Sequence, residues 1–291
     1  MLPLDGIRVL DMTQWIVGSA TAATLAEWGA EVVKVEHPEH GDPLRGVFAS
    51  GTVTVRSVNF YWDLVNRNKK SVALDIRHPL GREAVHRLVQ QADVFISNIR
   101  PGTLKRLGYD YETLSELNPR LIYAYANSFG TKGKDVERKG MDETAFWARG
   151  GIMSILGDPG TPVSILRGAM GDLTTSMFLA TGIGMALYVR SKTGLGQRVD
   201  SSLYGSAIWV NGFDIQATLG SGQESLRTSR KARRNPFNNA YQTKDERWVQ
   251  LAITDFEKHR LAIFQALGRD DLKEDPRFSS RATIYKHNQE L

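Results

Sequence analysis

The sequence predicts an α/β fold in which helices cover both faces of a parallel sheet. A strand–helix–strand pattern at the start of the chain is the first sign of this fold. Apolar runs then continue to alternate with helix-favouring stretches to about residue 125, which indicates parallel strands joined by helical crossovers. With 291 residues and 41% hydrophobic content, the chain can also bury a large core.

The opening unit consists of an apolar run at 7–12, a helix at 19–28 and a second apolar run at 31–36, with Gly29 ending the helix. The later predicted elements are a strand near 71–75, a helix at 80–92, strands at 93–97 and 121–125, a long apolar helix at 173–190, a strand at 198–202, a helix at about 203–219, a hairpin around Lys244 and Asp245, and a helix at 255–267.

A polar, basic and glycine-containing segment marks the expected domain boundary. We predict a large domain at 1–219, a linker at 220–238 and a partial small domain at 239–291. The last of these is too short for a substantial independent core.

Composition excludes several functions. The chain has no cysteine, which rules out disulfides, thiolate metal sites and a cysteine nucleophile, and fits a cytoplasmic location. The N-terminus does not look like a signal peptide, and no run approaches the ~18 apolar residues of a membrane span, so we expect no membrane association.

The net charge of +5 suits phosphorylated cofactors as well as nucleic acid. His37 and His40 are close in sequence but lack a carboxylate cluster, so we predict no metal.

Two aspartates are candidates for chemistry. Asp172 follows Gly171 directly before the predicted long helix, where its side chain can cap the helix and where the helix dipole is expected to lower its pKa. The same position would keep a carboxylate ionised for nucleophilic attack. Asp142 begins another helical stretch beside Glu143, and capping also explains it. The residues alone leave both interpretations open.

The first strand-to-helix turn, TQWIVGSA, lies where open α/β sheets bind ligands and can present backbone N–H groups to a phosphate. It lacks the G-x-G-x-x-G pattern, which disfavours a nicotinamide cofactor.

Six sequence blocks, spread in order along the chain, contain most of the segments described above. PLDGIRVLDMT, LAEWGAEVVKVEHPEHGDPLR, NKKSVALDI, NIRPGTLKRLGYDYETLSELNPRLIYA, RGAMGD and RSKTGLGQRVDSSL together resemble the class III CoA-transferase family. The resemblance implies a Rossmann-like large domain, a smaller α+β domain and an interlocked homodimer. Family members are typically longer, with a C-terminal segment that returns to the large domain. We therefore expect this chain to be a fragment or a truncated relative.

The resemblance also implies a mechanism. The Asp of the RGAMGD block, here Asp172, attacks the thioester of an acyl-CoA donor, and aspartyl anhydride and aspartyl-CoA thioester intermediates carry CoA to a small carboxylic acid. Asp142 is the second catalytic candidate. No cofactor is bound permanently, since the CoA thioester is a co-substrate, and no nucleic-acid partner is expected. The positions that match the family's CoA contacts are Gln14, Trp15, Ile16, Val17, His37, Leu74, Arg77, Asn98, Ile99, Thr103, Arg106 and Lys139.

Three alternatives to the CoA-transferase interpretation stay open. The same fold hosts α-methylacyl-CoA racemases, but their Gly-His-Asp motif is Gly140-Met141-Asp142 here, and methionine cannot move a proton. A truncated, non-catalytic CoA-binding homologue is the second. A basic nucleic-acid-binding or scaffold protein is the third, although the basic linker lacks interleaved aromatics. Among transferases, the resemblance is closer to enzymes for 2-hydroxy or aryl acids than to those for oxalate.

Overall fold

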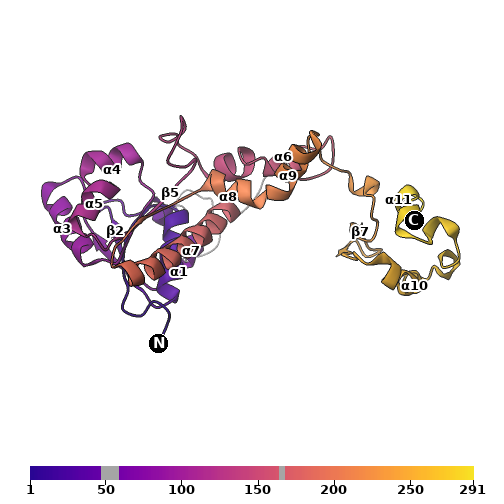
Figure 1. Cartoon of the computed structure of the whole chain (residues 1–291), viewed down its shortest axis with the longest axis horizontal. Coiled ribbons are helices and arrows are strands. Elements are labelled where there is room, and N and C mark those ends of the chain that lie inside the picture. Colours follow the sequence, from indigo (N-terminus) through magenta and orange to yellow (C-terminus); the bar gives the residue numbers. More distant parts are fainter. Residues whose placement is uncertain (47–58, 164–167) are drawn as a thin grey trace. The chain divides into compact units, whose positions relative to one another are not determined.

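The sheet of the large unit is six-stranded and wholly parallel (Figure 1). The computed structural model describes residues 1–46, 59–163 and 168–291, so Arg167 of the RGAMGD block lies outside the described residues. The strand order is β3-β2-β1-β4-β5-β6. The strands are β1 (Arg8–Met12), β2 (Glu31–Glu36), β3 (Lys69–Ala73), β4 (Val94–Ser97), β5 (Ile122–Asn127) and β6 (Arg198–Ser202). The α/β prediction is confirmed.

Both faces of the sheet are covered, which explains why its strands read as continuous apolar runs. Along β4, Val94 and Ile96 belong to one buried cluster and Phe95 to the other. The first cluster involves α1 (Val17–Glu27), the π-helix η2 (Asp142–Ala148), α6 (Ile152–Ile155), α7 (Met170–Thr193) and α8 (Leu203–Val210). The second involves α3 (Pro79–Gln91), α4 (Pro101–Leu107) and α5 (Tyr111–Leu117), and Figure 1 shows these helices on the opposite side from α1 and α7.

Helix α7 is longer than the sequence predicts. By length and composition alone it could cross a membrane, which corrects the expectation that no segment approaches such a span. Core helices pass the same test, and Leu179, Ile183 and Ala186 of α7 are completely buried against the sheet. Its exposed side carries Met185 and Tyr188.

Local details also differ from the sequence prediction. The helix expected at 203–219 is two helices, α8 and α9 (Gly212–Ser221), which meet at Asn211. The Asn211 side chain donates a hydrogen bond to the carbonyl of Gly150, which fixes the break. The short elements η1 (Pro43–Gly46) and α2 (Phe60–Asn66) were not predicted.

The described residues divide into two compact units. The first lies within Met1–Met153 and Ile165–Gln223, and the second within Ser154–Ser164 and Glu224–Leu291. The sequence division kept residues 154–163 in the large domain, whereas the structure groups them with the second unit. There Arg227 donates hydrogen bonds to the carbonyls of Ser154 and Thr161.

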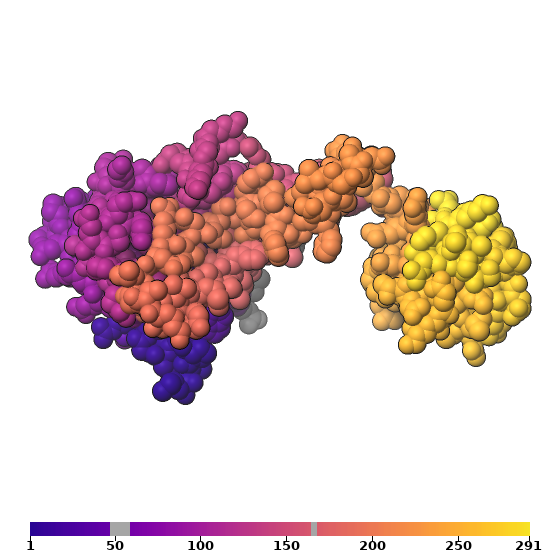
Figure 2. Space-filling model, in the orientation of Figure 1, coloured from indigo at the N-terminus to yellow at the C-terminus, as the bar shows by residue number. Residues whose placement is uncertain are grey.

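The second unit forms a body of its own (Figure 2). Its buried cluster is Phe237, Phe256, Phe264, Leu272, Phe278 and Ile284. Its elements are η3 (Arg230–Ala232), the antiparallel pair β7 (Ala240–Gln242) and β8 (Trp248–Gln250), α10 (Phe256–Ala266), η4 (Asp270–Leu272), η5 (Pro276–Phe278) and α11 (Arg281–Lys286). Four packed phenylalanines supply a core that the length of 239–291 did not suggest.

Candidate active site

The candidate site lies at the carboxyl edge of the sheet, where the strand order reverses between β1 and β4. Open α/β sheets bind ligands at such a switch point because the turns after the two strands diverge there. The turn after β1 holds Thr13, Gln14 and Trp15, and the turn after β4 begins with Asn98. The Asn98 amide joins the two turns, accepting from Gln14 N at 2.9 Å and donating to Gln14 O at 2.6 Å.

Asp172 and Asp142 line one cavity of about 170 Å³, which we call the nucleophile cavity. Its lining residues are Trp15, Ile16, Val17, Asn98, Ala126, Asn127, Ser128, Gly140, Met141, Asp142, Asp172 and Leu203. They come from the end of β5, from the turns after β1, β4 and β5, and from the starts of α1, η2, α7 and α8. The structure therefore brings together two acids that are 30 residues apart in sequence.

Asp172 lies inside the first turn of α7, not before it. The helix begins at Met170 and its N-cap is Ala169, which has a left-handed φ of 49° and makes no side-chain cap bond. The expected capping role of Asp172 is therefore wrong. No described residue donates a hydrogen bond to its carboxylate, which is partly buried and faces the cavity.

Asp142 caps α7 from outside the helix. Its Oδ1 accepts a hydrogen bond from Asp172 N at 3.1 Å, and its Oδ2 accepts one from Trp147 Nε1 at 2.9 Å. Asp142 does not cap its own helix, since η2 has Met141 as its N-cap. A Cβ on Gly171 would lie 2.1 Å from Asp142 Oδ1 and 2.3 Å from Phe146 Cγ, so only glycine allows this approach.

The electrostatics of Asp172 are opposite to the sequence expectation. Burial raises the pKa of Asp172 to about 7, with further contributions from the charges of Asp142 and Glu143. Burial also raises the pKa of Asp142, although its hydrogen bonds from Trp147 and the α7 backbone oppose this. The pKa of Asp172 is not lowered as predicted, because Asp142 accepts the hydrogen bonds from the free N–H groups of α7 and adds a like charge beside Asp172.

A second cavity of about 420 Å³ adjoins the first, and we call it the long cavity. Trp15 and Asn98 line both cavities. Of the predicted CoA contacts, Gln14, His37, Leu74, Arg77, Ile99, Thr103 and Arg106 line the long cavity as well. Arg100, which the sequence analysis did not single out, also lines it and provides a third exposed guanidinium beside Arg77 and Arg106. Three arginines around one cavity can bind several phosphate groups.

The predicted residues do not all reach these cavities. Ile16 and Val17 line the nucleophile cavity, but Lys139 is exposed and lines neither of the two. Asn127 and Ser128 were missed, and their position directly at the end of β5 is the signal that could have found them.

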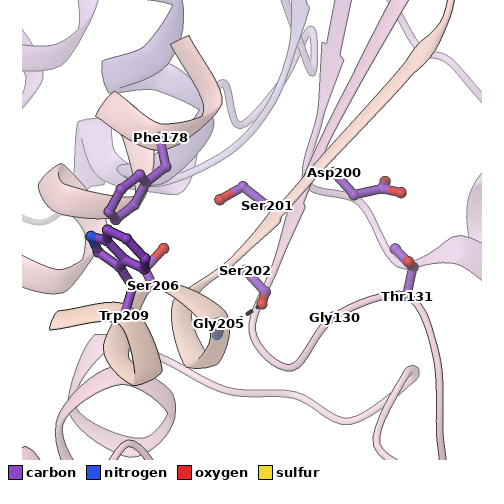
Figure 3. Close-up of a pocket in the computed structure, with 9 residues that line it drawn as sticks. All are labelled: Gly130, Thr131, Phe178, Asp200, Ser201, Ser202, Gly205, Ser206 and Trp209. Carbon is purple, nitrogen blue, oxygen red and sulfur yellow. Dashed lines mark hydrogen bonds between the residues drawn. The ribbon is translucent and has the colours of Figure 1, made fainter. Parts of the chain in front are cut away.

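A larger cavity of about 510 Å³ lies beside β6 (Figure 3). The rings of Phe178 and Trp209 face each other on one side, and Ser201 and Ser202 lie on the other. Its one titratable lining residue, Asp200, is paired with Arg198 at 2.9 Å. Its lining has neither a carboxylate free of an ion pair nor a cation for phosphate, so Asp172 is the stronger candidate for the reaction site. Among the described residues, no three potential metal ligands gather into one group.

The comparisons with known proteins agree with this geometry. Residues 4–291 match the model of CoA-transferase family III. The chain belongs to this family. It is 36% identical to the cinnamoyl-CoA:phenyllactate CoA-transferase of Clostridium sporogenes over 94% of this chain and 67% of that one. It is 31% identical to the (R)-2-hydroxy-4-methylpentanoate CoA-transferase of Clostridioides difficile over 99% of this chain and 72% of that one.

Solved structures of the family have the same fold. The crystal structure of a CAIB/BAIF family protein from Brucella suis matches all of this chain and 76% of that protein, with a TM-score of 0.85 and 31% identity. The family III assignment makes this protein a CoA-transferase, and it provides the chemistry against which the two aspartates and the arginine-lined cavity can be tested.

Proposed function

We propose that the protein moves CoA from an acyl-CoA donor to a carboxylic acid acceptor and that the Asp172 carboxylate is the covalent nucleophile. One observation carries the choice of residue. Asp142 uses both oxygens as hydrogen-bond acceptors, whereas the Asp172 carboxylate accepts none from a described residue and faces the same cavity. A nucleophile needs an available lone pair, and Asp172 has it.

The reaction would proceed by four acyl exchanges. The Asp172 carboxylate attacks the thioester carbonyl of the donor and expels CoA thiolate, giving an aspartyl anhydride. The thiolate attacks the aspartyl carbonyl and releases the donor acid, leaving an aspartyl-CoA thioester. The acceptor carboxylate then attacks this thioester and expels CoA thiolate, giving a second aspartyl anhydride. The thiolate attacks the acceptor carbonyl of this anhydride, which forms the acceptor acyl-CoA and frees the Asp172 carboxylate. The start of α1 at Ile16 and Val17 has no side-chain cap, so its N–H groups can stabilise the oxyanions.

Mass spectrometry tests the nucleophile directly. After incubation with an acyl-CoA donor alone and trapping with hydroxylamine, we expect a hydroxamate on the peptide that contains Asp172. The matched variant Asp142→Asn should still form the adduct, whereas Asp172→Asn should not. Active wild-type enzyme without a modified Asp172 would exclude this mechanism.

The long cavity is the proposed site of the CoA nucleotide. Arg77, Arg100 and Arg106 are exposed around it and have no acidic partner among the described ion pairs, so phosphate oxygens can replace water on them. Replacing Arg106 by Ala should raise the KM for the acyl-CoA donor by about tenfold, the loss of one charge-assisted contact. Arg87→Ala is the matched control, because Arg87 is exposed but pairs with Glu83 on α3. Equal KM values in both variants would reject this site.

The acceptor we propose is an apolar monocarboxylic 2-hydroxy acid. None of the described residues that line the nucleophile cavity is cationic, while Val17, Met141 and Leu203 are apolar. A dicarboxylate would place its second charge near Asp142 without a partner, which is unfavourable. The relatives that act on phenyllactate and 2-hydroxy-4-methylpentanoate support this class. A panel with one acyl-CoA donor should give higher kcat/KM for phenyllactate than for malate or oxalate, and the reverse order would refute the proposal.

Racemisation is a second candidate because a carboxyl with a pKa of about 7 suits a general base. Met141 opposes it, since this position offers no second proton carrier. Incorporation of solvent deuterium at the α-carbon of an acyl-CoA, without an acceptor acid, would favour the racemase.

A homodimer is the proposed assembly. The α7–α9 segment exposes large apolar side chains, with Met185 at 62%, Trp209 at 75% and Phe213 at 94% exposure. Such a surface is rarely left in water on a monomer. Light scattering should give twice the mass of the chain, and Phe213→Asp should lower it; a monomeric wild type would contradict the proposal.

A further inference from the structure

The turn between β1 and α1 has an unusual backbone conformation at its tip. Trp15 has a φ of 63°, one of four non-glycine residues with positive φ among the described residues. Side chains with a Cβ avoid this left-handed region, so the surrounding structure must hold Trp15 there. The residue is also one of the two that line both the nucleophile cavity and the long cavity. Its conformation therefore affects both sites.

The three peptide groups between Met12 and Trp15 each have a side-chain partner. Asn98 holds Gln14 through two hydrogen bonds, as described above. Lys34 Nζ donates to Thr13 O at 2.9 Å. The N–H of Trp15 donates to Asp42 Oδ1 at 3.1 Å, and this oxygen also accepts from Leu44 N at 2.9 Å. Asp42 is thus the side chain that holds the strained residue itself.

Asp42 is fixed in turn by buried charges under the turn. Lys34 Nζ lies 2.9 Å from Asp42 Oδ2 and 3.7 Å from Asp11 Oδ2, and Lys69 Nζ lies 2.9 Å from Asp11 Oδ2. These four side chains are 0–2% exposed, and their two positive and two negative charges balance. Buried ion pairs add little net stability, because desolvation offsets their attraction. Their geometric effect on the turn is therefore the better explanation of the cluster.

We propose that Asp42 is a positioning residue that fixes Trp15 in the left-handed conformation and so sets the boundary between the two cavities. With Trp15 fixed, the thioester end of a bound acyl-CoA is directed from the long cavity toward Asp172. This inference rests on the proposed CoA site in the long cavity. Asp42 itself touches neither cavity, since it lines neither of them.

Asp42→Asn is the informative variant because an amide cannot satisfy both neighbours of the carboxylate. Whichever way it turns, its NH₂ group faces either Lys34 Nζ or the N–H groups of Trp15 and Leu44, and all of these are donors. Asp93→Asn is the matched control: Asp93 pairs with the buried Arg190 at 2.8 Å and accepts from Arg8 N, at the opposite edge of the sheet. Both variants disturb the ion pair of a buried basic side chain, but only one affects Trp15.

Fluorine NMR of protein labelled with 5-fluorotryptophan reports on Trp15 without any ligand, and Trp15→Phe assigns its resonance among the six tryptophans. We expect this resonance to shift or broaden in Asp42→Asn and to stay in place in Asp93→Asn. We also expect the KM for acyl-CoA to rise on the order of tenfold in Asp42→Asn, with a smaller change in kcat, and to stay within about twofold in Asp93→Asn.

The outcomes separate the two proposals. An unchanged Trp15 resonance in folded Asp42→Asn overturns the positioning role, and so does a shifted resonance with an unchanged KM. A wild-type enzyme without CoA affinity would instead refute the proposed CoA site, and the fluorine spectra would still decide whether Asp42 fixes Trp15. If Asp42→Asn does not fold, Asp42→Ala with Lys34→Met removes the ion pair as a unit, and comparison with Lys34→Met alone, which also loses the bond to Thr13 O, isolates the bond to Trp15.

Discussion

Replacing the nucleophile by its neutral isostere should stabilise the fold at neutral and alkaline pH. The pKa of Asp172 is about 7 in the folded protein, against an ordinary value of 3.8. The protonated carboxyl therefore favours the folded state. This contribution is fully present below pH 3.8 and is lost as the pH rises through about 7, because ionisation is easier in the unfolded chain. Asp172→Asn keeps the neutral form at every pH.

The size of the effect follows from the two pKa values. Their difference corresponds to an upper limit of about 4 kcal/mol at pH 8, falling to less than half of that at pH 5. Because the carboxyl is only partly buried, water screens its charge, and we expect a gain of roughly 1–3 kcal/mol at pH 8.

Urea unfolding of the wild type and Asp172→Asn at pH 5 and pH 8 measures this gain. Asp110→Asn is the opposite control in the same unit: burial acts against the Asp110 charge, but hydrogen bonds from Thr113 hold its pKa below the ordinary value. That variant should lose stability at pH 8. An Asp172→Asn protein that gains nothing at pH 8, or gains as much at pH 5, would refute the reasoning.

Three further predictions concern the same pair of acids. Asp142→Asn removes a like charge from Asp172, so the ascending limb of kcat/KM against pH, expected near pH 7 in the wild type, should move to lower pH; an unmoved limb would show that Asp142 does not influence the nucleophile. Gly171→Ala should lower kcat on the order of tenfold or more, because the new Cβ would displace Asp142 and Phe146 and so misplace the catalytic groups. A kcat at the wild-type level would contradict this close packing. Trp147→Phe removes the hydrogen bond to Asp142 and should cost about 1–3 kcal/mol of unfolding free energy, as measured by thermal or urea unfolding, and no loss would indicate that water replaces the indole N–H.

Much of the fold could be predicted from the sequence because its strands are buried on both faces. Such strands are continuous apolar runs, as in β4 and β5, and they stand out in any sequence window. Helices of about two turns, such as α4 and α5, were harder to predict, because seven residues show little periodicity. The cytoplasmic location and the division into domains stay predictions.

The residues that gather around the two cavities could be predicted from the sequence, but the electrostatics of Asp172 could not. Residues that follow the strands can be read from the order of elements, and most of those named from the family resemblance line one of two adjoining cavities. The pKa of Asp172 depends on a contact with Asp142, 30 residues away, which no local pattern contains. Lys139 was named from the family resemblance, but its exposed side chain lines neither cavity.

The reacting carboxylate of the nucleophile cavity and part of the cavity wall come from different segments of the chain. Asp172 stands on α7, a helix anchored in the core, whereas Ser128, Gly140 and Met141 belong to the chain between β5 and η2. Substitutions or length changes in that connection can therefore alter the shape of the acid that fits without moving the reacting carboxylate. An engineer who wishes to change the acceptor can randomise this connection first, and then Val17 and Leu203 on the other walls, without replacing the reacting carboxylate.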